Sequence, residues 1–179
     1  LQNNGKGREF SLIDRDGTPI TKYFGDVYAT SYKGSFAQLA QAQRHRTIDY
    51  SFKFTGESFF IPPIIKDDEK LVKEWLNDCA KQYNVFPQGM LVEIEERGTY
   101  KNFILKMQER ICSCAQLEIS KQTLETLREY KQALCVSKHP RYAELKDFNT
   151  SRCTFPDKYK FDCKTPCGFY DGITGEREI

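Results

Sequence analysis

The residues best suited to chemistry form a short basic cluster, Arg44-His45-Arg46, with Gln41 three positions before Arg44. Residues three apart share a face of a helix, so Gln41 and Arg44 could act together. A guanidinium offers a planar fork of donors that suits phosphate oxygens, and a nearby amide can read a base or ribose edge. The cluster indicates either a compact anion site or an ordinary solvated basic turn. For His45, the alternative to a functional role is a packed or surface imidazole.

A second polar segment begins at Arg110, within a stretch of amphipathic helical pattern. Arg110 falls off the apolar stripe, so its side chain can reach a cleft. Gln116 and Glu118 follow next to core positions, and by themselves they indicate a solvated helix face. The stripe consists of Tyr100, Phe103, Met107 and Ile111.

Three of the seven cysteines, Cys153, Cys163 and Cys167, lie near the carboxyl end of the sequence. Zinc prefers four thiolate or imidazole ligands, with close pairs two to four residues apart, and Cys163-x3-Cys167 fits such a pair. Cys135 or His139 could complete the set. Because no second close pair exists, reduced thiols are the favoured interpretation, and zinc is the alternative.

Antiparallel strands are predicted from alternating apolar residues. We expect a hairpin over residues 8–24, turning at 14–17, a strand over 48–54, and a strand over 90–95 that turns at Arg97-Gly98.

Helices are predicted between and after these strands. Ser35 can cap a helix over 36–46, with Phe36, Leu39 and Ala40 on its buried side. A long helix starts after Asp67-Asp68 and ends before Phe86, with an apolar stripe from Leu71 to Tyr83. Further helices cover 100–115 and the region of Leu124 to Leu134, which His139-Pro140 closes. Together these elements predict an α+β fold of antiparallel strands packed with a bundle of long helices.

The 179 residues suffice for one hydrophobic core, and a content of 39% hydrophobic and 29% charged residues is that of a globular protein. A formal net charge of +2 argues against nucleic acid as a partner. No apolar run reaches the roughly 20 residues that cross a bilayer, and the amino end is not a signal peptide. We expect a cytoplasmic protein with a linker at 1–7, a domain at 8–150 and an irregular tail at 151–179.

The two polar segments together resemble the flavin-dependent thymidylate synthases. That family has an Arg-His-Arg motif with a Gln three residues before it, as in Gln41-Ala42-Gln43-Arg44-His45-Arg46. It also has a strand followed by a helix with an Asn-Phe-Leu element, an Arg and an Ala-Gln-aromatic-Glu-Ile signature. Asn102-Phe103-Ile104, Arg110 and Ala115-Gln116-Leu117-Glu118-Ile119 stand in the same order. The resemblance spans roughly residues 34 to 135.

The resemblance implies an enzyme that makes dTMP from dUMP, methylenetetrahydrofolate and NADPH, with FAD as the hydride carrier. Arg44, His45, Arg46 and Asn102 would bind the cofactor. Gln41, Arg46 and Arg110 would bind dUMP, and Arg110 would also polarise its pyrimidine ring. The family's homotetramers share active sites between subunits, so a homo-oligomer is expected.

The sequence departs from the family pattern at one position that the family uses for dUMP. A Ser is expected eight residues after the second Arg of the motif, and this sequence has Phe54 there. Asn102 also lies about three residues farther from Arg110 than the family spacing. An alternative is therefore a non-catalytic domain of the same fold, one half of a larger two-domain protein that serves assembly or nucleotide binding.

Overall fold

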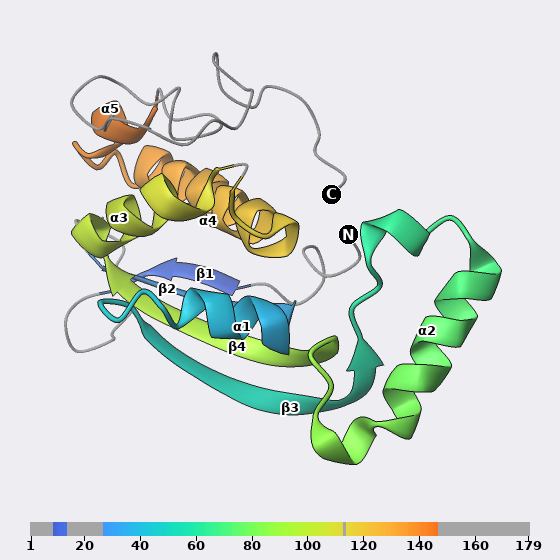
Figure 1. Ribbon diagram of the computed structural model, residues 1–179. Coiled ribbons are helices and arrows are strands. Elements are labelled where there is room, and N and C mark those ends of the chain that lie inside the picture. Colours follow the sequence, from blue (N-terminus) through green and yellow to red (C-terminus); the bar gives the residue numbers. More distant parts are fainter. Residues whose placement is uncertain (1–8, 14–26, 113, 147–179) are drawn as a thin grey trace.

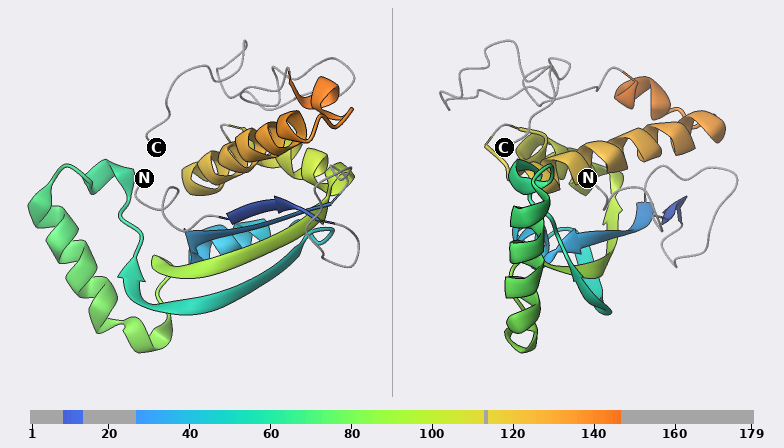
Figure 2. Two further views of the ribbon diagram at one scale, coloured as in Figure 1. Left: turned by 180° about the vertical axis from the view of Figure 1, so that it is seen from behind. Right: turned by 90° about the vertical axis from the view of Figure 1, so that its right-hand side faces the viewer.

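The computed structural model describes residues 9–13, 27–112 and 114–146. Within these residues the chain forms a four-stranded antiparallel sheet, and α1, α3 and α4 pack against one of its faces (Figures 1 and 2). The predicted α+β class with antiparallel strands is confirmed at this level. In spatial order the strands are β1 (Glu9–Leu12), β2 (Val27–Ser35), β4 (Met90–Thr99) and β3 (Asp49–Phe59).

The central strand β2 was not predicted, although its sequence carries a period-two signal. Tyr28, Thr30 and Tyr32 alternate with smaller or charged residues, and these three side chains are buried against the helices. Strand β1 pairs with β2, from Glu9 opposite Ser31 to Leu12 opposite Tyr28. The predicted partner of β1, residues 18–24, lies outside the described residues.

The other two strands are longer than predicted. Strand β3 contains the predicted strand over 48–54 apart from Ile48, and continues past a register shift to Phe59. Strand β4 runs to Thr99, so the predicted turn at Arg97-Gly98 is wrong: Arg97 pairs with both Ala29 and Asp49. Gly98 pairs with Tyr28 within the strand, and a Cβ there would lie 3.1 Å from the Tyr28 ring, tighter than most real contacts, so this position favours glycine.

Helix α1 (Phe36–Ala42) begins as predicted, because the Ser35 hydroxyl accepts a hydrogen bond from the Gln38 N–H. It ends at Ala42 instead of continuing to Arg46. The prediction of its buried side is wrong for Ala40, which is exposed; Gln38, Leu39 and Ala42 are buried instead. Gln41 and Arg44 therefore do not share a helix face.

Helix α2 (Glu69–Lys81) begins at the predicted acidic cap, where Asp68 accepts hydrogen bonds from two backbone N–H groups. It extends beyond the end of the sheet (Figure 1). Its predicted apolar stripe is only partly covered by the described residues: Cys79 is buried, Trp75 and Leu76 are half-buried, and Leu71 is exposed. Short 3-10 turns flank the helix at Pro63–Ile65 and Tyr83–Val85.

The last three helices are α3 (Tyr100–Arg110), α4 (Leu117–Val136) and α5 (Tyr142–Leu145). The helix predicted over 100–115 is thus five residues too long, because the chain leaves helical geometry at Ile111, where ψ is 72°. This break allows α4 to start in a new direction and to lie across β1, β2 and α1.

The main core lies between the sheet and α3 and α4. Its centre is aromatic: the Phe103 and Tyr130 rings stack at 5.3 Å, and Tyr28 from the sheet meets Phe103 edge-on at 5.1 Å. In the part of the chain that is described, no helix is long and apolar enough to cross a membrane.

Candidate functional site

Two polar segments that are far apart in sequence meet where α1 and α3 end. Arg110 is the last residue of α3, and its Nη2 donates to the Gln41 carbonyl oxygen at 3.4 Å, across a sequence separation of 69 residues. The Arg110 side chain is only 15% exposed. The structure therefore brings together Gln41 and Arg110, which were predicted separately as substrate-binding residues.

His45 lies in the turn after α1 and is buried, with its backbone N–H bonded to the Ala42 carbonyl at 2.9 Å. Its Nε2 is 3.5 Å from Oε2 of Glu109. Burial and the neighbouring Arg110 cation lower the pKa of His45 to about 4, although Glu109 acts in the opposite direction. At neutral pH, His45 is therefore an uncharged imidazole that can donate one hydrogen bond and accept another.

Asn102, predicted to bind cofactor, attaches the loop after α1 to α3. Its Nδ2 donates to the Thr47 carbonyl at 2.6 Å. Thr99 in turn caps α3 by accepting a hydrogen bond from the Asn102 backbone N–H. Asn102 thus fixes the path of the chain through residues 43–48.

Arg44 and Arg46 lie on the same loop, but both are exposed. Neither is seen in an ion pair or hydrogen bond with another described residue. Their guanidinium charges are therefore available to an anion, such as a phosphate group, that approaches this loop from solvent.

Four buried polar atoms around Arg110 lack a hydrogen-bond partner among the described residues. They are Oε1 of Gln41, Nε2 of His45, the hydroxyl of Tyr50 and Nε of Arg110 itself. A buried polar group without a partner costs about 1–3 kcal/mol, so a concentration of them calls for an explanation. A polar ligand bound among them is one way to supply the missing donors and acceptors.

Tyr50, at the start of β3, is the site residue that sequence reasoning missed. Burial raises its pKa well above the usual value, and the nearby Glu96 carboxylate adds to this effect, so the phenol stays protonated. Lys106 Nζ lies 5.5 Å from the centre of the Tyr50 ring. The alternation of the predicted strand over 48–54 could have placed Tyr50 on the helix-covered side with its hydroxyl inside the protein.

A fully buried ion pair lies beneath Tyr50. Nζ of Lys106 is 2.6 Å from Oε2 of Glu96, and both side chains are 0% exposed. Tyr28 and Tyr32 donate hydrogen bonds to the same carboxylate at 2.5 and 2.8 Å. Burial alone would raise the pKa of Glu96, but Lys106 and the two hydroxyls hold it below its usual value. The carboxylate is thus charged and fully partnered, which makes it structural.

Glu118 was expected on a solvated helix face, and this expectation is wrong. Its side chain is buried, and its two oxygens accept hydrogen bonds from the Ser35 N–H at 2.8 Å and the Ser35 hydroxyl at 2.5 Å. Gln116, which precedes α4, is half-buried.

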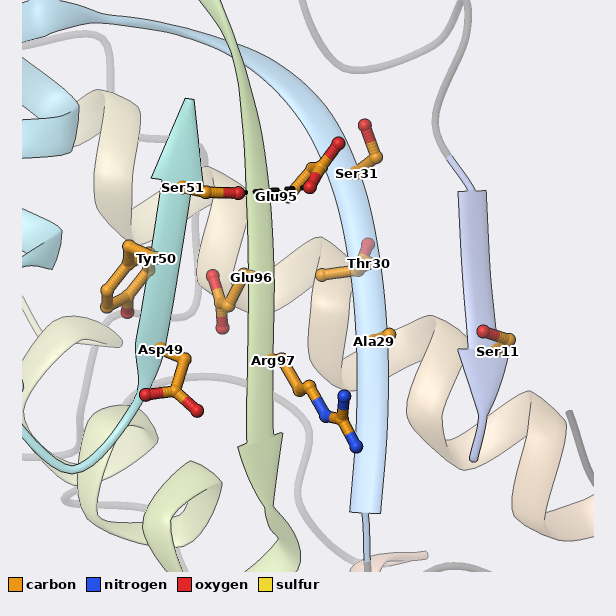
Figure 3. Close-up of a pocket in the computed structure, with 10 residues that line it drawn as sticks. All are labelled: Ser11, Ala29, Thr30, Ser31, Asp49, Tyr50, Ser51, Glu95, Glu96 and Arg97. Atoms are coloured by element: carbon orange, nitrogen blue, oxygen red, sulfur yellow. Dashed lines mark hydrogen bonds between the residues drawn. The ribbon is translucent and has the colours of Figure 1, made fainter. Parts of the chain in front are cut away.

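A hollow of about 420 Å³ opens on the other face of the sheet, and its lining also includes Tyr50 and Glu96 of the group described above. Figure 3 shows it between Ser11, Ser31, Ser51, Asp49 and Arg97, with Glu95 near its centre. Its charges are largely matched: Lys53 Nζ lies 2.6 Å from Glu95 Oε1, and Ser51 donates to the other Glu95 oxygen at 3.0 Å. The unpartnered atoms around Arg110 make the helix-covered side of the sheet the better candidate site.

Phe54, at the position where the family pattern has Ser, does not belong to the Arg110 group. It is 51% exposed and contacts the Phe36, Phe52 and Phe86 rings at centroid distances of 5.1–5.7 Å. Four residues of strand separate it from Tyr50, or roughly 13 Å. The position of the expected hydroxyl is thus part of an aromatic surface patch.

The predicted zinc ligands Cys153, Cys163 and Cys167 lie outside the described residues. Of the two candidates for a fourth ligand, Cys135 is exposed and His139 is half-buried. Over residues 9–13, 27–112 and 114–146, no group of three or more His, Cys, Asp or Glu side chains could hold a metal ion.

In comparisons with known proteins, the chain matches no protein-family model and no curated protein.

Proposed function

We propose that this chain is a flavin-dependent thymidylate synthase, which methylates dUMP to dTMP with methylenetetrahydrofolate and NADPH as co-substrates. One observation carries the proposal: the segments that resemble the family motifs, 41–47 and 102–110, meet at the Arg110–Gln41 and Asn102–Thr47 hydrogen bonds. Buried polar atoms without partners lower stability, so a purely structural contact between the two segments does not explain why such atoms gather where they meet.

The residues present fit a cofactor such as FAD, which combines phosphate groups with a polar ring edge. Arg44 and Arg46 offer exposed guanidinium groups for phosphate, and His45 offers a buried, unpartnered Nε2 for a neutral polar edge. When bound, FAD supplies the hydride-carrying chemistry that no amino-acid side chain provides. Binding and orientation are the tasks left to the protein.

Arg110 is the residue best placed to act on the nucleotide. Its guanidinium is mostly buried and has an unpartnered Nε, so its hydrogen bond to a pyrimidine carbonyl would be formed in a site with little water. Such a bond strengthens as negative charge develops on the carbonyl oxygen, which polarises the ring for reaction. Gln41 Oε1 and the Tyr50 hydroxyl can hold the remaining polar edge of the ring. The proposal includes that the protein works in the cytoplasm and forms a homo-oligomer.

The Phe54 patch favours a second candidate, a non-catalytic domain that kept the fold as one half of a larger assembly. Where the family uses a hydroxyl for dUMP, this chain exposes an aromatic ring among other aromatic rings. An apolar surface of this kind is typical of a protein–protein contact.

Visible absorption of the purified protein, before and after incubation with FAD and gel filtration, tests the proposal. We expect a retained flavin band that shifts when dUMP is added, and dTMP formed when methylenetetrahydrofolate and NADPH follow. The Arg110→Ala variant should lose the dUMP-induced shift. Arg128→Ala, which removes an exposed arginine of α4, is the matched control and should behave like the unmodified chain. A protein that stays colourless at high FAD would refute the enzyme and favour the second candidate.

A further inference from the structure

Helix α1 is too short to hold its own place. It has seven residues, and helices below about 12 residues are marginal in water without external contacts. The loop with Arg44, His45 and Arg46 follows directly after it. The position of α1 therefore sets where this loop begins, and the Asn102–Thr47 bond holds its far end.

At its first turn, α1 is held by Glu118. The Ser35 hydroxyl has one hydrogen and gives it to Glu118 Oε2 at 2.5 Å, so the hydroxyl oxygen is free to accept from the Gln38 N–H at 3.1 Å. Glu118 Oε1 accepts the Ser35 N–H at 2.8 Å. The carboxylate therefore takes up both donors of Ser35 and selects the rotamer that caps the helix.

At its last turn, α1 is held by residues that lie close to Glu118 in the sequence. Ala42 packs against Ala115 and Ile119, and the Gln41 carbonyl accepts from Arg110. The segment from 110 to 119 thus touches both ends of α1. Glu118 provides the only charged group at the first turn among the contacts described, and its two bonds at 2.8 Å or less are shorter than the 3.4 Å bond of Arg110.

We propose that Glu118 is a positioning residue of the candidate site: by holding Ser35 it fixes α1, and through α1 it sets the Gln41–Arg46 loop against Arg110. The choice of FAD as the ligand rests on the proposed function, whereas the positioning of α1 by Glu118 does not depend on it. Glu118 lies inside the protein and does not itself need to touch a ligand.

The test compares Glu118→Ala with Glu118→Gln and with a destabilised control, Leu134→Ala. Leu134 is fully buried in the main core, 16 positions farther along α4 and so roughly 24 Å away. Two quantities are measured on each protein at a temperature where denaturant titration shows it folded. They are the hydrogen-exchange protection of the α1 amides and the affinity for FAD, followed by flavin fluorescence.

We expect Glu118→Ala to expose the α1 amides and to weaken FAD binding roughly tenfold, since the loss of about one hydrogen bond to the displaced loop has an effect of that size. Glu118→Gln keeps an oxygen for the Ser35 N–H and should recover part of both effects. Leu134→Ala should lose stability while it keeps α1 protection and FAD affinity. A purely structural Glu118 would instead make the Glu118→Ala and Leu134→Ala variants alike.

The two readouts separate this inference from the proposed function. If the unmodified chain binds no FAD, the proposed function fails, and α1 protection alone still decides whether Glu118 positions the helix. If the unmodified chain binds FAD and Glu118→Ala binds it equally well with α1 still protected, the positioning role is overturned.

Discussion

The pH dependence of stability should carry a signature of His45. In the folded chain the pKa of His45 is lowered from 6.5 to about 4, first by burial and then by Arg110. Between these two values the unfolded chain binds a proton at His45 that the folded chain does not. By linkage, stability that is fully present above pH 6.5 falls as the pH drops toward 4.

The size of this loss follows from the shift. At about 1.4 kcal/mol for each pKa unit, the drop from 6.5 to about 4 sets a ceiling of roughly 3–4 kcal/mol. The true value should be lower, because Glu109, 3.5 Å from His45, is largely exposed and can reorient toward the imidazolium. We therefore expect a loss of about 1–3 kcal/mol in the free energy of unfolding.

Urea titrations at several pH values between 4 and 7 measure this loss, with His45→Gln as the perturbation. The variant has no titrating group at position 45, so its stability should fall less on acidification than that of the unmodified chain. The difference between the two proteins removes contributions they share, such as that of Glu96, whose lowered pKa also costs stability in acid. His139→Gln removes the chain's other histidine and should keep the steep loss. Parallel curves for the unmodified chain and His45→Gln would refute the reasoning.

Three further predictions concern residues that hold the site in place. Lys106→Met leaves the buried Glu96 carboxylate without its cation and should lower the free energy of unfolding, measured by urea titration, by about 3–5 kcal/mol. The double variant Glu96→Gln/Lys106→Met should recover much of this loss, and equal losses in the single and double variants would contradict a coupled pair. Gly34→Ala places a Cβ 2.6 Å from Gln38 Oε1 and 2.9 Å from Ile94 Cδ1, so we expect the free energy of unfolding to fall by about 1–3 kcal/mol. The same change at exposed Gly56, where φ is 108°, meets no neighbouring atom and so tests backbone strain alone. Asn102→Ala removes the hydrogen bond to the Thr47 carbonyl and should lower stability by about 1 kcal/mol and weaken FAD binding; Asn102→Asp has nearly the same shape and also lacks the amide donor. An unchanged FAD affinity in these variants would show that Asn102 does not help to hold the site.

Local signals in the sequence predicted the starts of helices well. Ser35 and Asp68 both cap a helix through hydrogen bonds to nearby backbone N–H groups, an interaction that needs only neighbouring residues. The ends were harder to predict. Helix α3 stops at Arg110, although apolar residues continue to Ala115, because the chain must turn there for α4 to reach α1. That requirement is set by packing across the fold.

The candidate site was predictable in part for the same reason. The charges of Arg44, Arg46 and Arg110 can be recognised in the sequence, and the segments around them resemble family motifs. Strand alternation could have shown that Tyr50 faces the helices, but its role and that of Glu118 could not be assigned, because both depend on partners far away in sequence: Glu118 is 83 residues from Ser35. A glutamate beside apolar residues is most often solvated, and only the fold shows that this one is buried.

The strand order has a consequence for how the chain folds. The central pair β2 and β4 joins residues such as Tyr28 and Glu96, which are 68 residues apart, and supplies the surface on which α3 and α4 pack. Closing a loop of that length costs roughly 4 kcal/mol of chain entropy by simple scaling. Contacts so distant in sequence slow folding relative to a helical bundle, whose contacts are mostly local. Until β2 and β4 meet, α1 and its basic loop have nothing to dock against, so the candidate site should be among the last parts to form.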